Sequence, residues 1–322
     1  MKTIGIGRLS TERTKQLRKL MNLSFSLHHL CILASPLPPT YSHFLNLRRQ
    51  PRSSSISLSS IRMSSTNNGG SITSSTSDVT VAELESIFKQ KRMIRSKVRK
   101  SLKEMDPSQR TLEDDAIQHL VLDAPWFKST RRLCAYISCH ALREVDTSKV
   151  LAQILQSSDK DKPGLEGKTL YVPRVEDKNS HMRMLNISSL DDLIANSMDI
   201  LEPAPVDSTG NPREDVMQAS EAVDLFLLPG LAFDKTGRRL GRGGGYLPSL
   251  MYYDTFLSKY RKLADKQNWK KPLLVALSYS IQILDDGVIP ITPNDVDVDA
   301  LVTPSGVIPV SAAARQRMEC DI

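Results

Sequence analysis

The spacing of apolar residues changes once along the chain, from a helical period to runs typical of strands. From residue 80 to Met105, apolar positions recur every three or four residues, and Asp106-Pro107 ends the pattern. Thr80 stands three residues before Glu83, which is the spacing of a capping box at a helix start. The pattern predicts one helix over about 80–105 and a second helix over about 108–123.

Short runs that are apolar at every position follow these helices. They cover residues 133–138, 169–173, 224–230, 273–278 and 300–304. Such runs indicate strands that are buried on both faces, as in parallel sheets covered by helices. We therefore predict a single α/β domain over about 80–312, with a mostly parallel open sheet flanked by helices on both faces, and a C-terminal tail over 313–322.

Polar and turn residues collect after the carboxyl ends of the first three runs. Glu144 and Asp146 follow the first run, Arg174 follows the second, and residues 229–234 end the third. In an open parallel sheet, ligands bind beyond the carboxyl ends of the strands. The sequence therefore predicts a ligand site at this rim of the sheet.

The positive net charge of the chain comes from its N-terminus. Residues 1–77 carry ten Lys and Arg and a single acid, so this segment is +9 and the remainder is −2. An Arg-rich, Ser-rich and acid-poor segment is typical of a mitochondrial or plastid transit peptide. We expect 1–77 to be a leader, mitochondrial or alternatively plastid; an extension ahead of a start at Met21 or Met63 is the other interpretation.

Charge and hydropathy also indicate which classes of partner the protein binds. Without the leader, the charge does not support a nucleic-acid partner. Apolar stretches fall short of the roughly 20 residues of a transmembrane helix. We therefore expect small-molecule partners, no nucleic acid and no membrane. The sequence does not determine the oligomeric state, and a monomer is the expectation.

A glycine-rich segment, Gly-Arg-Gly-Gly-Gly-Tyr at 241–246, is the strongest chemical signal. It has neither the P-loop fingerprint nor the dinucleotide fingerprint. Consecutive glycines can nevertheless turn several N–H groups toward one anion, and Arg239 and Arg242 supply planar charged groups for phosphate oxygens. An isolated triple glycine is also typical of a flexible surface turn. The two arginines favour a phosphate site.

A basic helix face and several carboxylates extend this signal. Lys91, Arg95 and Arg99 are spaced i, i+4, i+8 and share one helix face. Alone they are typical of a solvated face, but beside an anion-binding loop they form a candidate triphosphate clamp. Asp254 and Asp295 are candidate Mg²⁺ ligands, because Mg²⁺ is usually held by one or two carboxylates with phosphates and water. For Asp297 and Asp299, the alternation of polar and apolar residues along a strand edge is a better explanation than metal binding.

Five motifs stand out along the predicted domain. They are LPGLAFDKTGRRLGRGGGY at 228–246, KRMIR at 91–95, YVPR at 171–174, HMRML at 181–185 and PNDVDVDALV at 293–302. Together they resemble the 5-formyltetrahydrofolate cyclo-ligase family, whose members are also called 5,10-methenyltetrahydrofolate synthetases. The resemblance covers about residues 85–310, and its most specific part is the long glycine-containing block.

The resemblance implies an ATP- and Mg²⁺-dependent enzyme that converts 5-formyltetrahydrofolate to 5,10-methenyltetrahydrofolate with release of ADP and phosphate. The formyl oxygen would be phosphorylated, and N10 would then close the ring. This chemistry needs positioning and charge neutralisation more than a protein nucleophile, which agrees with the lack of a legible catalytic triad. A folate- or nucleotide-binding protein with impaired catalysis is the alternative. An α/β enzyme acting on phosphorylated sugars or CoA esters would rest on fold analogy alone.

Site residues follow from the resemblance by matching motif, in three sets. The residues implied to bind ATP are Lys91, Arg92, Arg95, Arg239, Gly241, Arg242, Gly243, Gly244, Gly245 and Tyr246. Those implied to bind the folate are Ile137, Glu144, Met182, Met198, Tyr246 and Tyr253, and those implied to bind Mg²⁺ are Asp254 and Asp295. Arg242, Tyr246 and Tyr253 are the implied catalytic residues.

The chain departs from the family pattern in two places. Met198 stands where many members have tryptophan, and the contiguous GYYD of the family is split here by residues 247–252. Six residues added helically would displace Asp254 by up to roughly 9 Å, so they must be absorbed or they abolish the site. On this basis alone, deleting 247–252 is expected to raise kcat/KM at least about tenfold.

Overall fold

The structure is a computed structural model that describes residues 80–157, 167–177, 181–196, 200–243 and 252–318. The predicted leader, 1–77, lies outside the described residues. No helix in these ranges is both long enough and apolar enough to cross a membrane.

Two helices open the described chain, as the sequence predicts. Helix α2 spans Val81–Glu104, and the capping box of Thr80 and Glu83 is formed at its start. Helix α3 spans Pro107–Asp123; Asp106 caps it by accepting hydrogen bonds from the N–H groups of Ser108 and Gln109. The proline at its first position cannot extend α2, which separates the two helices.

A seven-stranded sheet forms the centre, in the order β12-β11-β9-β6-β1-β2-β3. The five inner strands are parallel, while β3 and β12 pair antiparallel at the two edges. The inner strands coincide with the five predicted apolar runs, so the mostly parallel α/β fold is confirmed. The bounds are β1 Arg132–Ala135, β2 Thr169–Val175, β3 Met182–Ile187, β6 Leu225–Leu228, β9 Leu273–Leu277, β11 Ala300–Thr303 and β12 Gly306–Pro309.

Smaller elements decorate the sheet. β7 (Ala232–Asp234), β8 (Arg239–Leu240) and β10 (Ile283–Leu284) form a three-stranded sheet, and β4 (Leu193–Ala195) pairs with β5 (Leu201–Pro203). The remaining α-helices are α4 (Pro125–Lys128), α5 (Ser148–Ser157), α6 (Tyr252–Lys266) and α7 (Ala312–Met318). Single 3-10 turns are η2 (His140–Leu142), η3 (Leu190–Asp192), η4 (Val216–Gln218) and η5 (Ser280–Gln282).

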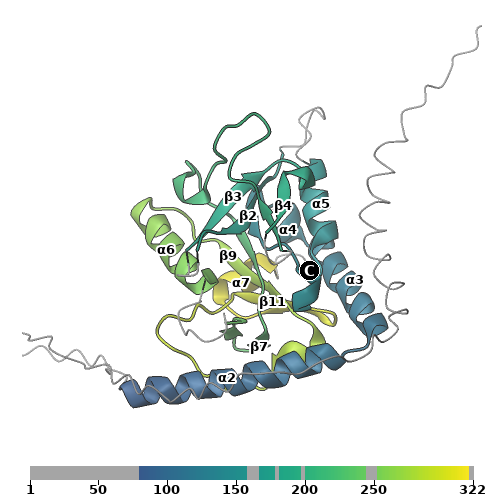
Figure 1. Cartoon of the computed structure of the whole chain (residues 1–322), viewed down its shortest axis with the longest axis vertical. Helices are drawn as coiled ribbons and strands as arrows, with labels where there is room; N and C mark the ends of the chain where they lie inside the picture. The colour runs from purple at the N-terminus through teal and green to yellow at the C-terminus, as the bar shows by residue number, and fades with distance from the viewer. Residues whose placement is uncertain (1–79, 158–166, 178–180, 197–199, 244–251, 319–322) are drawn as a thin grey trace, which may run out of the picture. The chain divides into compact units, whose positions relative to one another are not determined.

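Alternate residues of each inner strand enter two different hydrophobic clusters. Leu225 and Leu227 of β6 belong to a cluster with α3, α4 and α5, whereas Phe226 and Leu228 belong to a cluster with α6. In Figure 1, α3 and α5 lie on one side of the sheet and α6 on the other. Both faces of the sheet are thus covered, as the apolar runs predict.

Helix α7 falls within the stretch that the sequence analysis treats as a tail. Its Ala314 is fully buried in the cluster shared with α3 and α4. Alanine-rich sequence favours a helix, and packing of this small side chain fixes the helix against the sheet. Regular structure therefore continues past residue 312, where the tail was predicted to begin, to Met318.

Candidate functional site

The candidate site lies where the strand order of the sheet reverses. The chain passes from β1 to β2 on one side of β1 and returns to β6 on its other side. Loops that leave two such strands diverge and make a crevice for ligands. The loop after β1 carries Ile137 and Glu144, and the chain after β6 leads through β7 and β8 to Arg242.

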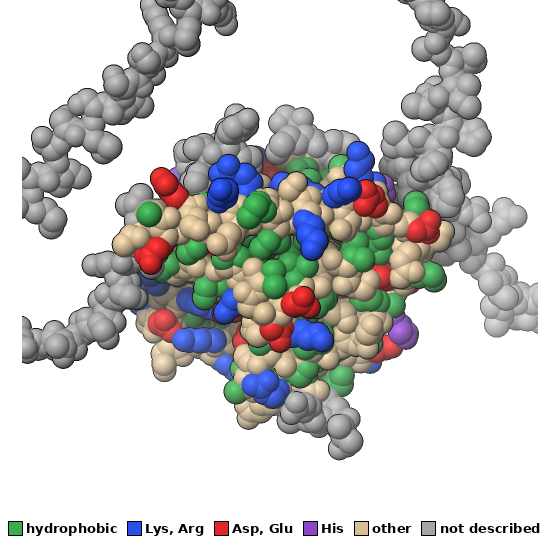
Figure 2. All heavy atoms as spheres, turned by 90° about the horizontal axis from the view of Figure 1, so that it is seen from below, with side chains coloured by type: hydrophobic (Ala, Val, Ile, Leu, Met, Phe, Trp, Pro, Cys, Tyr) green, Lys and Arg blue, Asp and Glu red, His purple; other side chains and the backbone are tan. Residues whose placement is uncertain are grey.

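Helix α2 brings its basic face to the glycine segment, defined here as Gly241–Gly243. Arg95 Nε donates a hydrogen bond to the carbonyl of Gly241 at 2.9 Å, and Arg99 donates to the carbonyl of Arg242. The predicted basic face therefore lies against the predicted loop. Arg92 is exposed to solvent, outside this contact. Seen from the side of α2, basic, acidic and apolar side chains are interspersed over the surface (Figure 2).

Glycine is required at residue 243 for two reasons. Its φ is +63°, in the left-handed region that residues with a Cβ rarely adopt. A Cβ at this position would also lie 3.0 Å from Arg95 Cζ and Nε. The absence of a side chain thus lets the guanidinium of Arg95 lie directly against the glycine segment.

Two ion pairs join basic residues of the site to the predicted metal ligands. Arg239 Nη2 donates to Asp254 Oδ1 at 2.5 Å, and the same oxygen accepts the main-chain N–H of Val296 at 3.0 Å. Lys91 is paired with Asp295 Oδ2. All four of these charged side chains are less than 10% exposed. Because buried charges are stable only when paired, the cations and carboxylates hold one another in place.

Arg95 lies within electrostatic reach of both carboxylates. Burial lowers the pKa of its guanidinium, and the neighbouring Arg99 lowers it further, whereas Asp295 and Asp254 raise it. Both carboxylates therefore act electrostatically on Arg95, which itself lies against the glycine segment.

The carboxylates fit a cation that arrives with a phosphate better than a permanent metal centre. Within the described ranges, Asp254 Oδ2 and Asp295 Oδ1 accept no hydrogen bond. No group of three or more His, Cys, Asp and Glu side chains that could hold a metal occurs there either. One or two carboxylate oxygens, completed by phosphate and water, are the usual surroundings of Mg²⁺.

A third ion pair joins the glycine segment to the loop after β1. Arg242 Nε donates to Glu144 Oε1 at 3.0 Å, and Glu144 Oε2 accepts the N–H of Cys139 at 3.0 Å. Burial raises the pKa of the Glu144 carboxyl, and the charge of Arg242 opposes this rise. Among the described residues, Arg242 Nη2 is buried and has no hydrogen-bond partner.

The predicted folate residues Ile137 and Met182 pack against different clusters. Ile137 follows β1 and is partly buried against the cluster of α3 and α5, whereas Met182 begins β3 in the cluster of α6. Tyr253 packs against both clusters. Burial raises the pKa of its phenol, and the charge of Glu144 raises it further. Tyr253 thus lies between the two apolar surfaces and near Glu144.

Several predicted residues lie outside the described ranges: Met198, Gly244, Gly245 and Tyr246, together with 247–251 of the insertion. Helix α6 is described from Tyr252, and Asp254, near the start of this described part, pairs with Arg239. Asp254 therefore reaches Arg239 with the extra residues present. The way in which residues 247–251 are absorbed lies outside the described residues.

Sequence reasoning missed a buried polar network behind Glu144. The Tyr279 hydroxyl lies 2.6 Å from Asp114 Oδ1 and 3.0 Å from the carbonyl oxygen of Glu144, and it accepts a bond from Arg110 Nε at 3.1 Å. Tyr279 is fully buried, and burial raises the pKa of Asp114. A helical polar residue such as Asp114 gives no sequence signal that it reaches a tyrosine 165 residues later.

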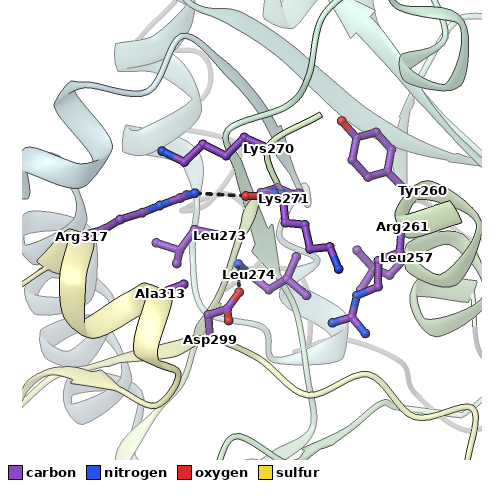
Figure 3. Close-up of a pocket in the computed structure, with 11 residues that line it drawn as sticks. Leu257, Tyr260, Arg261, Lys270, Lys271, Leu273, Leu274, Asp299, Ala313 and Arg317 are labelled. Atoms are coloured by element: carbon purple, nitrogen blue, oxygen red, sulfur yellow. Dashed lines mark hydrogen bonds between the residues drawn. The ribbon is translucent and has the colours of Figure 1, made fainter. Parts of the chain in front are cut away.

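A separate hollow of about 430 Å³ lies at the amino end of β9, between α6 and α7 (Figure 3). Its lining includes Arg261, Lys271 and Arg317, and Arg317 donates to the carbonyl of Lys271 at 3.1 Å. None of the described residues of the predicted site lines this hollow. The candidate site is therefore identified by converging polar groups and not by the size of a cavity.

The fold and the site define a class of protein: an α/β protein with an arginine-bound glycine segment at the switch point of its sheet. Comparison with known proteins makes this specific. Residues 87–304 match the model of the 5-formyltetrahydrofolate cyclo-ligase family. The chain belongs to this family, and the resemblance inferred from its motifs is confirmed.

Relatives of known name agree with the family assignment. The chain is 64% identical over 244 residues to a mitochondrial 5-formyltetrahydrofolate cyclo-ligase of Arabidopsis thaliana, covering 76% of this chain and 84% of that protein. It is 27% identical to the Mus musculus 5-formyltetrahydrofolate cyclo-ligase, covering 66% and 92%. The solved structure of Aquifex aeolicus 5,10-methenyltetrahydrofolate synthetase matches with a TM-score of 0.50 and 26% identity, covering 68% and 92%. The prediction of an enzyme of this family is confirmed.

Proposed function

We propose that this chain converts 5-formyltetrahydrofolate to 5,10-methenyltetrahydrofolate, with ATP and Mg²⁺, and releases ADP and phosphate. One observation carries the proposal beyond family membership. Arg95 bonds to the glycine segment, which includes Arg242, and the carboxylates of the buried pairs Arg239–Asp254 and Lys91–Asp295 act electrostatically on Arg95. This supports a site for a polyphosphate that arrives with a divalent cation.

The proposed ATP site consists of the basic face of α2 and the glycine segment. Lys91, Arg95 and Arg239 neutralise phosphate charge, and the N–H groups of residues 241–246 bind phosphate oxygens. Arg242 donates to the transferring phosphoryl group through its buried, unpartnered Nη2. Arg92 is the weakest member of the set, because it is exposed and has the mobility of a surface side chain.

The proposed Mg²⁺ ligands are Asp254 and Asp295, each with one carboxylate oxygen that accepts no hydrogen bond within the described residues. When bound, Mg²⁺ neutralises charge on the phosphate oxygens. Arg239 and Lys91 fix the other oxygen of each carboxylate, so the free oxygens are held in position before the nucleotide arrives.

The proposed folate site lies on the other side of Arg242. Glu144 accepts hydrogen bonds from the pterin, and Ile137, Met182 and Met198 contact its apolar parts. Tyr246 and Tyr253 close over the reacting formyl group. Support comes from Tyr253, which packs against both the cluster that Ile137 contacts and the cluster that contains Met182, and which feels the charge of Glu144.

The proposed chemistry has two steps. The formyl oxygen attacks the γ-phosphorus of ATP, the bond to the β-phosphate oxygen breaks, and ADP leaves. N10 then attacks the formyl carbon, the carbon–oxygen bond breaks, phosphate leaves and the N10 proton passes to solvent. Arginines and amide N–H groups stabilise charge in the first step without acting as nucleophiles.

The test is the absorbance of the methenyl product when the protein is mixed with 5-formyltetrahydrofolate. We expect the absorbance to grow only with ATP and Mg²⁺ both present. A folate- or nucleotide-binding protein with impaired catalysis would bind its ligands without growth of this absorbance, and that result would overturn the proposal. The position of Asp254 beside Arg239, despite the insertion at 247–252, favours the active enzyme.

We further propose that the chain functions in mitochondria as a monomer, with these small molecules and neither nucleic acid nor membrane as partners. The leader composition and the mitochondrial relative of Arabidopsis thaliana support the location. Import of the full-length chain into isolated mitochondria but not plastids is expected. Import into plastids alone would assign it to the alternative organelle, and light scattering tests the monomer.

A further inference from the structure

We propose that Glu144 is a positioning residue for Arg242, and that their ion pair couples the folate site to the nucleotide site. This inference rests on the proposed function, in which Glu144 contacts folate and Arg242 contacts ATP. It adds that Glu144 determines the affinity for ATP, which it does not itself contact.

The first support is that Glu144 is fixed from several directions. Its Oε2 accepts the N–H of Cys139, and its carbonyl oxygen lies 3.0 Å from the Tyr279 hydroxyl. The preceding Arg143 adopts a left-handed conformation with φ 53°, which turns the chain back toward the end of β1. The carboxylate is 9% exposed, so little solvent competes for it. Glu144 is therefore a rigid partner for a cation.

The second support is the way in which Arg242 is held. Its Nε donates to Glu144 Oε1 at 3.0 Å, and its carbonyl oxygen accepts a bond from Arg99 on α2. Both the side chain and the main chain of Arg242 are thus anchored, one by the loop after β1 and one by α2. The guanidinium is 19% exposed, so its rotation is restricted by its surroundings.

The third support is a hydrogen-bond donor of Arg242, Nη2, that remains without a partner among the described residues. Arg242 Nη2 is buried, and no described residue accepts a hydrogen bond from it. A buried donor without a partner is unfavourable, so an acceptor is expected when the site is filled. Because Nε is occupied by Glu144, the fixed planar geometry of the guanidinium sets the direction in which Nη2 meets a ligand oxygen.

Two consequences follow. Removing the charge of Glu144 leaves Arg242 without its anchor and without a counter-charge for its burial, so ATP affinity falls even when no folate is present. In addition, a folate that binds Glu144 changes the surroundings of Arg242, and the two ligands then alter each other's affinity by the same factor, as linkage requires.

The experiment measures the affinity of full-length protein for the Mg²⁺ complex of adenylyl imidodiphosphate by calorimetry, without folate. We expect Glu144→Gln, which keeps the shape and removes the charge, to weaken binding about tenfold. Glu221→Gln is the matched control, because this glutamate is 71% exposed and pairs with Arg132 away from the site. It should bind like the parent, and thermal melting of each variant checks folding.

A double-mutant cycle separates positioning from a general effect of charge. In an Arg242→Ala background, Glu144→Gln should cause no further loss of nucleotide affinity, because the residue that it positions is gone. Loss of folate binding with unchanged nucleotide affinity in Glu144→Gln, or equal losses in both backgrounds, would overturn the coupling. Failure of the parent to bind the nucleotide would instead contradict the proposed function.

Discussion

Arg242 is the residue on which most of the proposed chemistry depends, because it belongs to the glycine segment and pairs with Glu144. We predict that Arg242→Ala raises the KM for ATP by about 10- to 150-fold, the value of a lost hydrogen bond to a charged group of roughly 1.5–3 kcal/mol. Folate affinity should fall much less. Steady-state kinetics and a separate folate titration measure the two effects, and equal losses would contradict the assignment of Arg242 to phosphate.

Glu144 should make ATP use sensitive to pH. Burial raises the pKa of this carboxyl, so it takes up a proton at higher pH than an ordinary glutamate. As pH falls through that raised pKa, the charge that anchors Arg242 is lost. The groups that face the carboxylate are Arg242, Tyr136 and Tyr253, and the two phenols stay neutral because their pKa values are raised by burial.

The expected result is a KM for ATP that rises as pH falls through the raised pKa of Glu144 in the parent and that rises less for Glu144→Gln. Titration of the nucleotide itself affects both proteins equally, so the difference between them isolates Glu144. The same rise in parent and variant would show that Glu144 plays no part in this pH dependence.

The pairs that make the site could not be predicted from sequence spacing. Lys91 and Asp295 are 204 residues apart, and Arg242 and Glu144 are 98 apart. Helical periodicity placed Lys91, Arg95 and Arg99 on one face, because that information is local. Which carboxylate each cation meets depends on strand order, which no local pattern contains.

At the scale of elements, buried runs and capped helices were predictable, whereas short and half-exposed elements were not. The five inner strands are mostly apolar, and α2 carries its own capping box. By contrast, β8 has two residues and β7 has three, too few to show a period. These small strands nevertheless matter, since they place Arg239 and the glycine segment beside α2.

The Tyr279 network connects α3 to the loop that carries Glu144, and its loss should be felt in stability. We predict that Tyr279→Phe lowers the free energy of unfolding by about 1–3 kcal/mol, because the partly buried Asp114 loses a hydrogen-bond partner. Tyr252→Phe is a matched control that loses one bond, to the carbonyl of the partly exposed Asp177. Urea denaturation compares them, and a smaller loss for Tyr279→Phe would contradict the network.

Deleting residues 247–252 tests whether the insertion between the glycine segment and Asp254 impairs the site. Because Asp254 already pairs with Arg239 while these residues are present, deletion of 247–252 should change kcat/KM by less than about tenfold. This replaces the larger gain expected from the sequence alone. Assays of the deletion variant beside the parent at saturating Mg²⁺ decide between the two. A gain of tenfold or more would show that the insertion restrains the site.

At the scale of the whole molecule, the switch point of the sheet explains why residues from distant segments meet. α2, the loop after β1 and the chain after β6 all reach the same rim, because β1 and β6 are neighbours with connections on opposite sides. The fold therefore brings the proposed nucleotide surface and the proposed folate surface together at Arg242. Under the proposed function, the residues at this rim bind ATP so that its γ-phosphate activates the formyl oxygen.

That claim is tested most directly by following the formyl oxygen itself. The parent protein is supplied with 5-formyltetrahydrofolate labelled with ¹⁸O in the formyl group, together with ATP and Mg²⁺, and the released phosphate is analysed by mass spectrometry. If the formyl oxygen attacks the γ-phosphorus, each phosphate released with methenyl product carries one ¹⁸O. Phosphate without the label, formed while the methenyl product accumulates, would mean that water cleaves ATP and that the formyl oxygen leaves by another route.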